Sequence, residues 1–146
     1  MSGPIVVGVD GSRAALAAVE WAVDAAARHG RPLRIVHVVE LPRSGVVLRP
    51  RDPDGVPDAE RAREFGGLLL RRAAELARER RADVEVDTGL LSGDVMEALR
   101  RETETAARIV LGSHGLGGST GLPPGSVARE MPNRAHCPVT VVRPGR

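Results

Sequence analysis

Residues 109–130, IVLGSHGLGGSTGLPPGSVARE, decide how this chain is expected to fold and what it is expected to bind. A short apolar run ends at Gly112, five more glycines follow up to Gly125, and a segment of helical character then begins. Glycine adopts positive φ and lets the backbone approach a ligand closely, so a glycine cluster between a strand and a helix is typical of an anion-binding loop. A long flexible turn is the alternative interpretation, and the rest of the chain decides between the two.

Strands and helices alternate along the chain around this segment. Apolar, β-branched runs predict strands at residues 5–10, 33–39, 83–91, 108–112 and 138–143. Helical periodicity predicts a helix over 13–29, a second over about 58–80, a third that starts at 92–94 and a short fourth from Ser126. Gly30 is placed to end the first helix, and Asp58 can cap the second. The second helix is expected to bury a stripe made of Ala62, Phe65, Leu69, Ala73, Leu76 and Ala77.

This alternation predicts one α/β domain over residues 1–146. The expected fold is Rossmann-like or flavodoxin-like, a five-stranded parallel sheet with helices on both faces, because parallel neighbours need crossover connections. In such sheets ligands bind beyond the carboxyl ends of the strands, where the strand order reverses. Asp10, at the end of the first strand, and Gly112, at the end of the fourth, are both expected on that edge.

Composition argues against several classes of protein. The 21 basic residues face 19 acidic ones, and the chain has no tyrosine, one tryptophan and one phenylalanine, so a nucleic-acid groove with stacking aromatics is not expected. No apolar run approaches the roughly 20 residues that span a bilayer, and the start of the chain lacks a leader pattern, which favours a cytoplasmic protein without a membrane partner. A single cysteine, Cys137, excludes an internal disulfide and gives no Cys/His metal cluster.

The common nucleotide-binding motifs are also absent from the sequence. Every lysine-dependent motif, the P-loop included, is excluded because all basic residues other than histidine are arginines. A dinucleotide fingerprint would follow the first strand, whereas this glycine loop follows the fourth. Flavin mononucleotide would usually be flanked by aromatic side chains, which are almost absent here.

The chain resembles the universal stress proteins of the ATP-binding kind. The signature of that family is GxxG, nine residues, then G[ST], and here GSHG at residues 112–115 is followed after nine residues by Gly125 and Ser126. The resemblance extends over essentially the whole chain, from IVVGVDGS and AAVEWA through LRIVHVV to GSVARE and CPVTVVRP.

The resemblance implies a set of contacts with an adenine nucleotide. Gly8, Val9 and Asp10 would contact the adenosine, and Val38 would bind the adenine edge through its main chain. The glycine loop would hold the ribose and phosphates, with Mg²⁺ accompanying the phosphates, through Gly112, His114, Gly115, Gly117, Gly125, Ser126 and Val127. Backbone amides of this loop can converge on phosphate oxygens at the start of the last helix. Ser126 has an alternative role as the side-chain N-cap of that helix.

Two departures from the family pattern bear on these expectations. Pro123 and Pro124 remove two backbone donors beside the expected phosphate site. Pro132 falls inside the last helix and predicts that this helix is short or kinked. No residue is singled out as catalytic or as a metal ligand.

The sequence therefore predicts a protein that binds ATP, or AMP or a cyclic nucleotide, and acts in stress response or signalling. A slow ATPase is one alternative, and a nucleotide-free interaction module is another, favoured if Pro123 and Pro124 close the cleft. The last strand would otherwise leave an unprotected sheet edge, so a homodimer is expected in which Thr140, Val141 and Val142 pair antiparallel across a two-fold axis.

Overall fold

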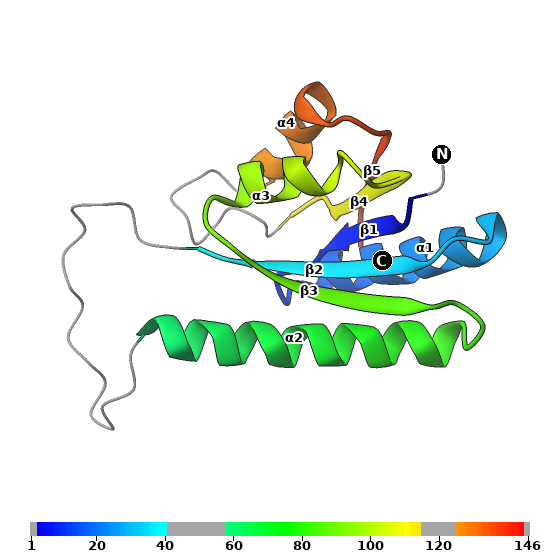
Figure 1. Ribbon diagram of the computed structural model, residues 1–146, viewed down its shortest axis with the longest axis horizontal. Coiled ribbons are helices and arrows are strands. Elements are labelled where there is room, and N and C mark those ends of the chain that lie inside the picture. The colour runs from blue at the N-terminus through cyan, green and yellow to red at the C-terminus, as the bar shows by residue number, and fades with distance from the viewer. Residues whose placement is uncertain (1–2, 41–57, 115–124, 145–146) are drawn as a thin grey trace.

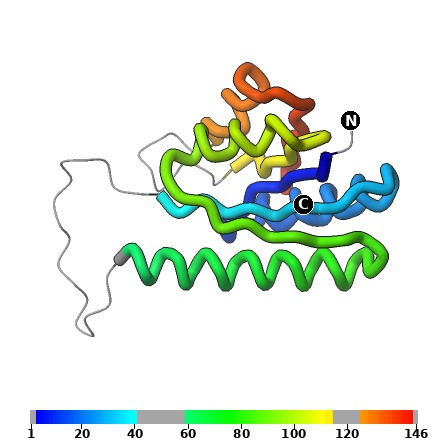
Figure 2. Tube along the Cα trace, in the orientation of Figure 1, coloured from blue at the N-terminus to red at the C-terminus, as the bar shows by residue number. Residues whose placement is uncertain are grey.

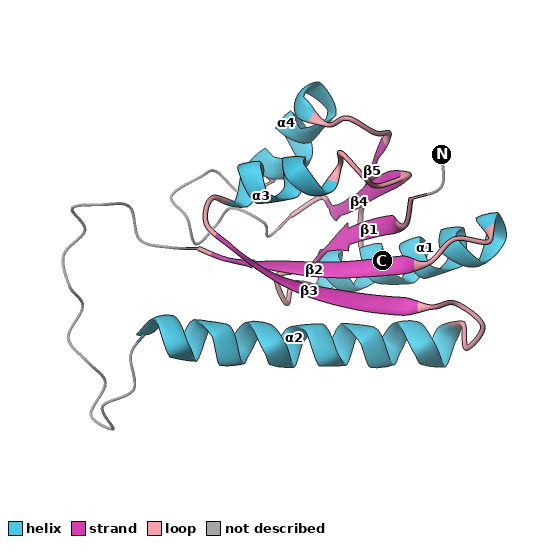
Figure 3. Cartoon of the chain, viewed as in Figure 1, coloured by secondary structure: helices cyan, strands magenta, loops and turns pink. Residues whose placement is uncertain are grey.

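A computed structural model describes residues 3–40, 58–114 and 125–144 of the chain. Strands and helices alternate throughout, as predicted (Figures 1 and 3). The elements are β1 (Ile5–Gly8), α1 (Arg13–His29), β2 (Leu33–Val39), α2 (Asp58–Arg80), β3 (Val86–Ser92), α3 (Val95–Glu102), β4 (Arg108–Gly112), α4 (Ser126–Arg134) and β5 (Val139–Val142).

The five strands form one parallel sheet in the order β3-β2-β1-β4-β5. Ile5 of β1 pairs with Leu33 on one side and with Arg108 on the other, so β1 lies at the centre. The chain moves outward from β1 to β2 and β3, then returns to the opposite side of β1 at β4. The strand order therefore reverses between β1 and β4, which confirms the predicted fold class and puts the ends of these two strands next to each other.

Two helical layers cover the sheet, with α1 and α2 on one face and α3 and α4 on the other (Figures 1 and 2). Alternate residues of β1 enter the two cores: Val7 packs with the α1–α2 layer and Val6 with the α3–α4 layer. The buried face of α1 is made mostly of alanine, which lets the helix lie close to the strands. Its members are Ala14, Ala15, Ala18, Val19, Ala22, Val23, Ala25 and Ala26.

Local capping signals fix the ends of α1 where the sequence predicts them. The Ser12 hydroxyl accepts a hydrogen bond from the Ala15 amide at 3.1 Å, and Gly30 ends the helix in the left-handed conformation with φ of 62°. Trp21 packs against the core of this face. In the described parts of the chain, every helix is too short or too polar to cross a membrane.

The predicted inner stripe of α2 is wrong at Phe65. Ala73 and Ala77 are buried as expected, but the Phe65 side chain is 56% exposed and Gly66 is buried instead. A Cβ on Gly66 would come within 2.7 Å of the His37 ring and 2.8 Å of Leu90, so any larger residue would have to displace these side chains where α2 crosses β2 and β3. The stripe is therefore turned by one position, toward Gly66, Leu70, Ala73, Ala74 and Ala77.

Two further boundaries differ from or refine the prediction. β3 begins at Val86 rather than at residue 83, because a turn at the end of α2 places the Val84 amide 3.2 Å from the Arg81 carbonyl oxygen. The fourth helix is short, as Pro132 predicts: it has nine residues and continues only two positions beyond the proline. The predicted connection over residues 42–57 lies outside the described residues.

Candidate functional site

The turn after β1 is held by Asp10 and Ser12. The Asp10 carboxylate accepts a hydrogen bond from the Ser12 amide at 2.9 Å, and the Ser12 hydroxyl caps α1. Gly11 between them has φ of 89°, a conformation that favours glycine. This turn places a half-buried carboxylate at the carboxyl edge of the sheet, where the sequence predicts it.

Val9 follows β1, and Val38 lies near the end of the neighbouring strand β2. His37, which precedes Val38, contacts the main chain of Val9 through its ring. The Val9 amide donates to the Val36 carbonyl at 2.9 Å, and His37 Nδ1 lies 2.7 Å from the Val9 carbonyl oxygen. Because a carbonyl oxygen only accepts, Nδ1 of His37 carries the proton. Gly8 is the last residue of β1 and pairs with Val36, so Val38 extends beyond the paired part of β1. The backbone of Val38 is therefore at the edge where a ligand of the crevice would lie.

Gly112, the last residue of β4, lies directly against the start of α1. A Cβ on Gly112 would come within 2.7 Å of the Ala14 backbone carbon and 2.9 Å of the Ala14 Cβ. The next residue, Ser113, donates its amide to the Val142 carbonyl at 2.9 Å and so remains tied to β5. The glycine at position 112 thus serves the packing of α1 against the strand end, in addition to any contact with a ligand.

Gly125 begins α4 and lies against Ser113. Gly125 is the N-cap residue, with φ of 79° and no side-chain capping bond, and a Cβ there would come within 2.8 Å of the Ser113 carbonyl oxygen. The alternative that Ser126 caps the helix with its side chain is wrong, because Ser126 is the first residue inside the helix. The two ends of the glycine segment therefore meet at one place beside β4.

Two buried hydroxyl groups at this place have no hydrogen-bond partner among the residues that the structure describes. They are the Oγ atoms of Ser113 and Ser126. A buried hydroxyl left without a partner costs about 1–3 kcal/mol, so native proteins pair such groups with protein, water or ligand. Their position at the N-terminus of α4 adds helix amides that have no partner inside the helix, those of Ser126 and Val127 included. The arrangement fits a phosphate or a sugar hydroxyl.

The remaining predicted site residues are placed as follows. His114 follows Ser113 and is exposed, while the Val127 side chain is fully buried in the α3–α4 core, so only its main chain can face a ligand. Gly115 and Gly117, together with Pro123 and Pro124, lie outside the described residues. Among the described residues, no group of three or more His, Cys, Asp or Glu side chains could hold a metal ion.

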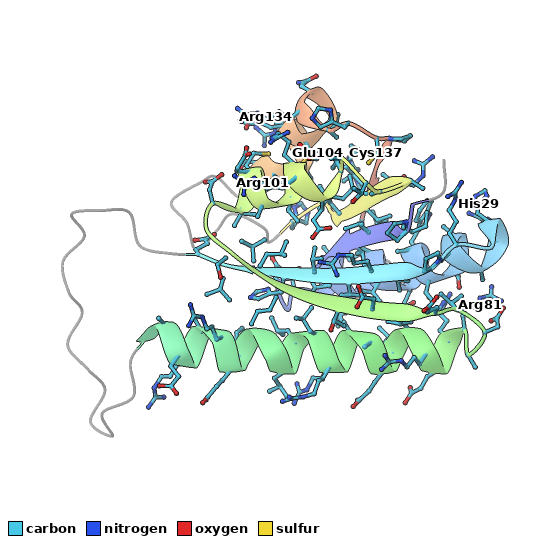
Figure 4. All side chains as sticks on the ribbon, viewed as in Figure 1. His29, Arg81, Arg101, Glu104, Arg134 and Cys137 are labelled. Carbon is cyan, nitrogen blue, oxygen red and sulfur yellow. The ribbon has the colours of Figure 1, made fainter. Side chains whose placement is uncertain are left out.

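Sequence reasoning missed Ser113. The residue stands at an unspecified position inside the GxxG signature, and only its burial marks it as a potential ligand group. A small polar residue directly after a buried strand is the signal that could have identified it. The side chains of Asp24, Arg80 and Arg81 form an ionic cluster that is separate from this site. Arg81, like His29 at the end of α1, lies at the end of the sheet where the strands begin (Figure 4).

Comparison with known proteins gives a match over almost the whole chain. A model of the universal stress protein family matches residues 1–143. Universal stress protein Rv3134c of Mycobacterium tuberculosis strain H37Rv is 37% identical over 145 residues, which covers 96% of this chain and 48% of the relative. The chain thus spans about half the length of that relative.

Solved structures have the same fold. A universal stress protein in complex with cAMP is 24% identical, with a TM-score of 0.70 over 99% of this chain and 98% of that one. The universal stress protein from Archaeoglobus fulgidus in complex with dAMP is 23% identical, with a TM-score of 0.65 over 97% of this chain and 99% of that one.

Proposed function

Because this chain belongs to the universal stress protein family, we propose that it binds an adenine nucleotide between the ends of β1 and β4 and acts in stress response or signalling. The observation that carries the proposal is the pair of buried, unpartnered hydroxyls of Ser113 and Ser126 beside the start of α4. Their burial is unfavourable unless protein, water or a ligand supplies hydrogen bonds. A phosphorylated ligand in the crevice would supply them.

The proposed contacts follow the strand ends. Asp10, with the main chain of Gly8 and Val9, would contact the adenosine, and the main chain of Val38 would bind the adenine edge. The ribose and phosphates would then lie toward β4 and α4. There they would meet Gly112, Ser113, His114, Gly115, Gly117, Gly125, Ser126 and Val127.

ATP with Mg²⁺ is the proposed ligand, with AMP and cyclic nucleotides as the competing forms. The start of α4 offers main-chain amides and hydroxyls to phosphate oxygens, and Mg²⁺ would bind mainly through the phosphates. The complexes of structurally similar proteins with cAMP and dAMP support an adenine nucleotide as the class. A cytoplasmic location is part of this proposal, and cell fractionation tests it.

We also propose that the protein forms a homodimer through β5. Among the strands that the structure describes, this strand pairs only with β4 and is therefore an edge of the sheet. Val141 is 42% exposed, and Thr140 is held by a 2.8 Å hydrogen bond from the Arg108 guanidinium. Pairing of Thr140, Val141 and Val142 with their counterparts would cover this edge.

Titration calorimetry tests the nucleotide proposal directly. ATP, AMP and cAMP would be titrated into the protein with and without Mg²⁺, with GTP as the control for the base. Saturable binding of one or more adenine nucleotides, and none of GTP, is the expected result. Absence of binding for all three adenine nucleotides at millimolar concentration would leave only the interaction-module alternative.

A further inference from the structure

In the described part of the chain, the outer edge of β3 leaves a run of backbone groups without a strand partner. Two hydrogen bonds show which residues of β3 face β2. The Leu33 amide donates to the Glu85 carbonyl at 2.8 Å, and the Gly93 amide donates to the Val39 carbonyl at 3.0 Å. In a parallel pair with this pattern of bonds, alternate residues of β3 direct their N–H and C=O groups away from β2. Those residues are Val86, Thr88, Leu90 and Ser92.

Only the beginning of this edge has a partner among the described residues. The Arg78 guanidinium donates to the Val86 carbonyl oxygen at 3.3 Å. Beyond that point β3 pairs with β2 alone, and Thr88, Leu90 and Ser92 retain open donors and acceptors. An edge of this kind is a template for the addition of another strand.

A groove runs along the last part of this edge. It has a volume of about 560 Å³ and lies between residues 90–94 and the side of α3 that carries Glu97, Ala98, Arg101 and Glu102. Leu91 and Ala98 supply its apolar surface, and both pack against the α3–α4 core. A strand edge flanked by a helix is the geometry in which domains bind an extended peptide by strand addition.

The opposite side of the same edge is also apolar. Leu90 is 41% exposed and lies against α2 at Gly66, where a Cβ would approach it to 2.8 Å. Phe65 and Leu68, on the same stretch of α2, are 56% and 39% exposed. Because alternate side chains of a strand point to opposite faces, an added strand would place apolar side chains near Leu91 on one face and near Leu90 on the other.

Asp94 lines the end of the groove, and Glu40, which follows β2, lies next to Asp94. The bond between Gly93 and Val39 holds these residues next to each other. Burial, with the charge of Asp94, raises the pKa of Glu40. In the described part of the chain neither carboxylate forms an ion pair, whereas Glu97 pairs with Arg100 and Arg101, and Glu102 with Arg34. A basic side chain placed here would supply the missing ion-pair partner and favour the ionised forms of both carboxyl groups.

We propose that the β3–α3 groove docks an extended, aliphatic segment of a partner protein, which pairs with the β3 edge and places an arginine or lysine beside Glu40 and Asp94. The proposal is independent of nucleotide binding, because the groove lies at the β3 edge whereas the nucleotide crevice lies between β1 and β4. The complementary features are the open backbone of residues 88–92, the apolar surfaces on both sides and the unpaired acidic end.

The test uses an acetylated and amidated hexapeptide of four valines with an arginine at each end, titrated into the ¹⁵N-labelled protein, so that valines face both apolar surfaces and an arginine reaches the acidic end in either strand direction. The amides of Thr88, Leu90 and Ser92 are expected to exchange with solvent in the free protein and to become protected when the peptide binds. The amides of Gly89 and Leu91, which face β2, should be protected in both states. No binding at millimolar peptide, or perturbation confined to other elements, overturns the proposal.

Paired variants separate strand addition from charge. Thr88→Pro removes an outward N–H without removing a bond to β2 and should abolish binding, while Thr88→Val should preserve it. Glu40→Gln combined with Asp94→Asn should weaken binding about fivefold, because asparagine keeps the cap of α3 but removes the charge. Glu79→Gln, at the C-terminal end of α2 and outside the groove, is the control for the loss of a negative charge as such. Equal affinity for a valine–glutamate peptide would contradict the charge complementarity.

Two controls keep the result interpretable. Thermal unfolding of each variant shows whether it folds. If Thr88→Pro does not fold, the carboxylate variants still test the proposal. Light scattering detects self-association: a dimer that Thr88→Pro disrupts would mean that a second copy of the chain covers β3. That result would overturn docking of a partner peptide.

Discussion

Gly125 lies so close to Ser113 that a Cβ on the glycine would come within 2.8 Å of the serine carbonyl oxygen. This contact joins the end of β4 to the beginning of α4 and leaves the hydroxyls of Ser113 and Ser126 buried at the junction. The glycine segment that begins at Gly112 and ends at Gly125 therefore starts and finishes at the same place in the fold. This closure supports the junction as the proposed phosphate site.

Gly125→Val is expected to destabilise the protein itself. The sequence alone suggests that valine at this position removes ligand binding and spares the fold, but Gly125 has φ of 79° and no room for a Cβ. The strained backbone and the clash together should cost at least about 2 kcal/mol. Gly30→Ala, at a helix end with φ of 62° and open space around it, should cost only about 1 kcal/mol, the cost of the left-handed backbone alone. Urea unfolding compares the two, and equal costs would contradict the role assigned to Gly125.

Val141→Glu should convert the proposed homodimer into a monomer. The substitution puts a carboxylate on the exposed edge of β5, where two like charges would meet across the two-fold axis. Leu68→Glu is a matched control, because Leu68 is 39% exposed on α2, which packs on the β2–β3 side of the sheet, opposite β5. Light scattering at high micromolar concentration should show a dimer for the control and a monomer for Val141→Glu. A wild-type monomer under the same conditions would contradict the dimer.

Asp24→Asn should destabilise the protein at neutral pH and much less in acid. Asp24 on α1 accepts hydrogen bonds at 3.0 Å from Arg80 and from Arg81, which end and follow α2. The bonds from Arg80 hold the pKa of Asp24 below its ordinary value of 3.8. Because the folded-state pKa is lowered, the stabilisation is present above pH 3.8 and is lost as the pH falls through the folded-state pKa.

The size of this effect is set by solvent exposure. These side chains are partly exposed, so the difference between Asp24→Asn and wild type should be at most about 1 kcal/mol at pH 7. Urea unfolding at pH 7 and at pH 2.5 measures it. A difference that grows as the pH is lowered would contradict the assignment of this ion cluster.

The parts of the structure that depend on local chemistry could be predicted from the sequence. Ser12 and Gly30 mark the two ends of α1 because capping depends only on neighbouring residues. The orientation of α2 could not be predicted, since hydrophobicity places Phe65 inside whereas the approach of His37 requires Gly66 there. Ser113 was missed for the same reason: whether its hydroxyl is buried depends on α4 packing beside β4, which no local pattern records.

We expect the buried hydroxyls of Ser113 and Ser126 to serve nucleotide binding rather than the stability of the fold. Thr103 provides the contrast, because its buried hydroxyl donates to the Arg100 carbonyl and accepts from the His136 amide at 3.0 Å. Thr103→Val should therefore lose about 1–3 kcal/mol of unfolding free energy and leave nucleotide affinity unchanged.

The decisive measurement is a calorimetric titration of the Ser113→Ala/Ser126→Ala double variant with the adenine nucleotide that binds wild type most tightly, together with urea unfolding of the ligand-free protein. If the two hydroxyls bind the nucleotide, the ligand-free variant should be as stable as wild type or more so, because it no longer buries unpartnered hydroxyls, and its affinity should fall at least about tenfold. Unchanged affinity, or a loss of stability as large as that of Thr103→Val, would show that the hydroxyls do not serve nucleotide binding.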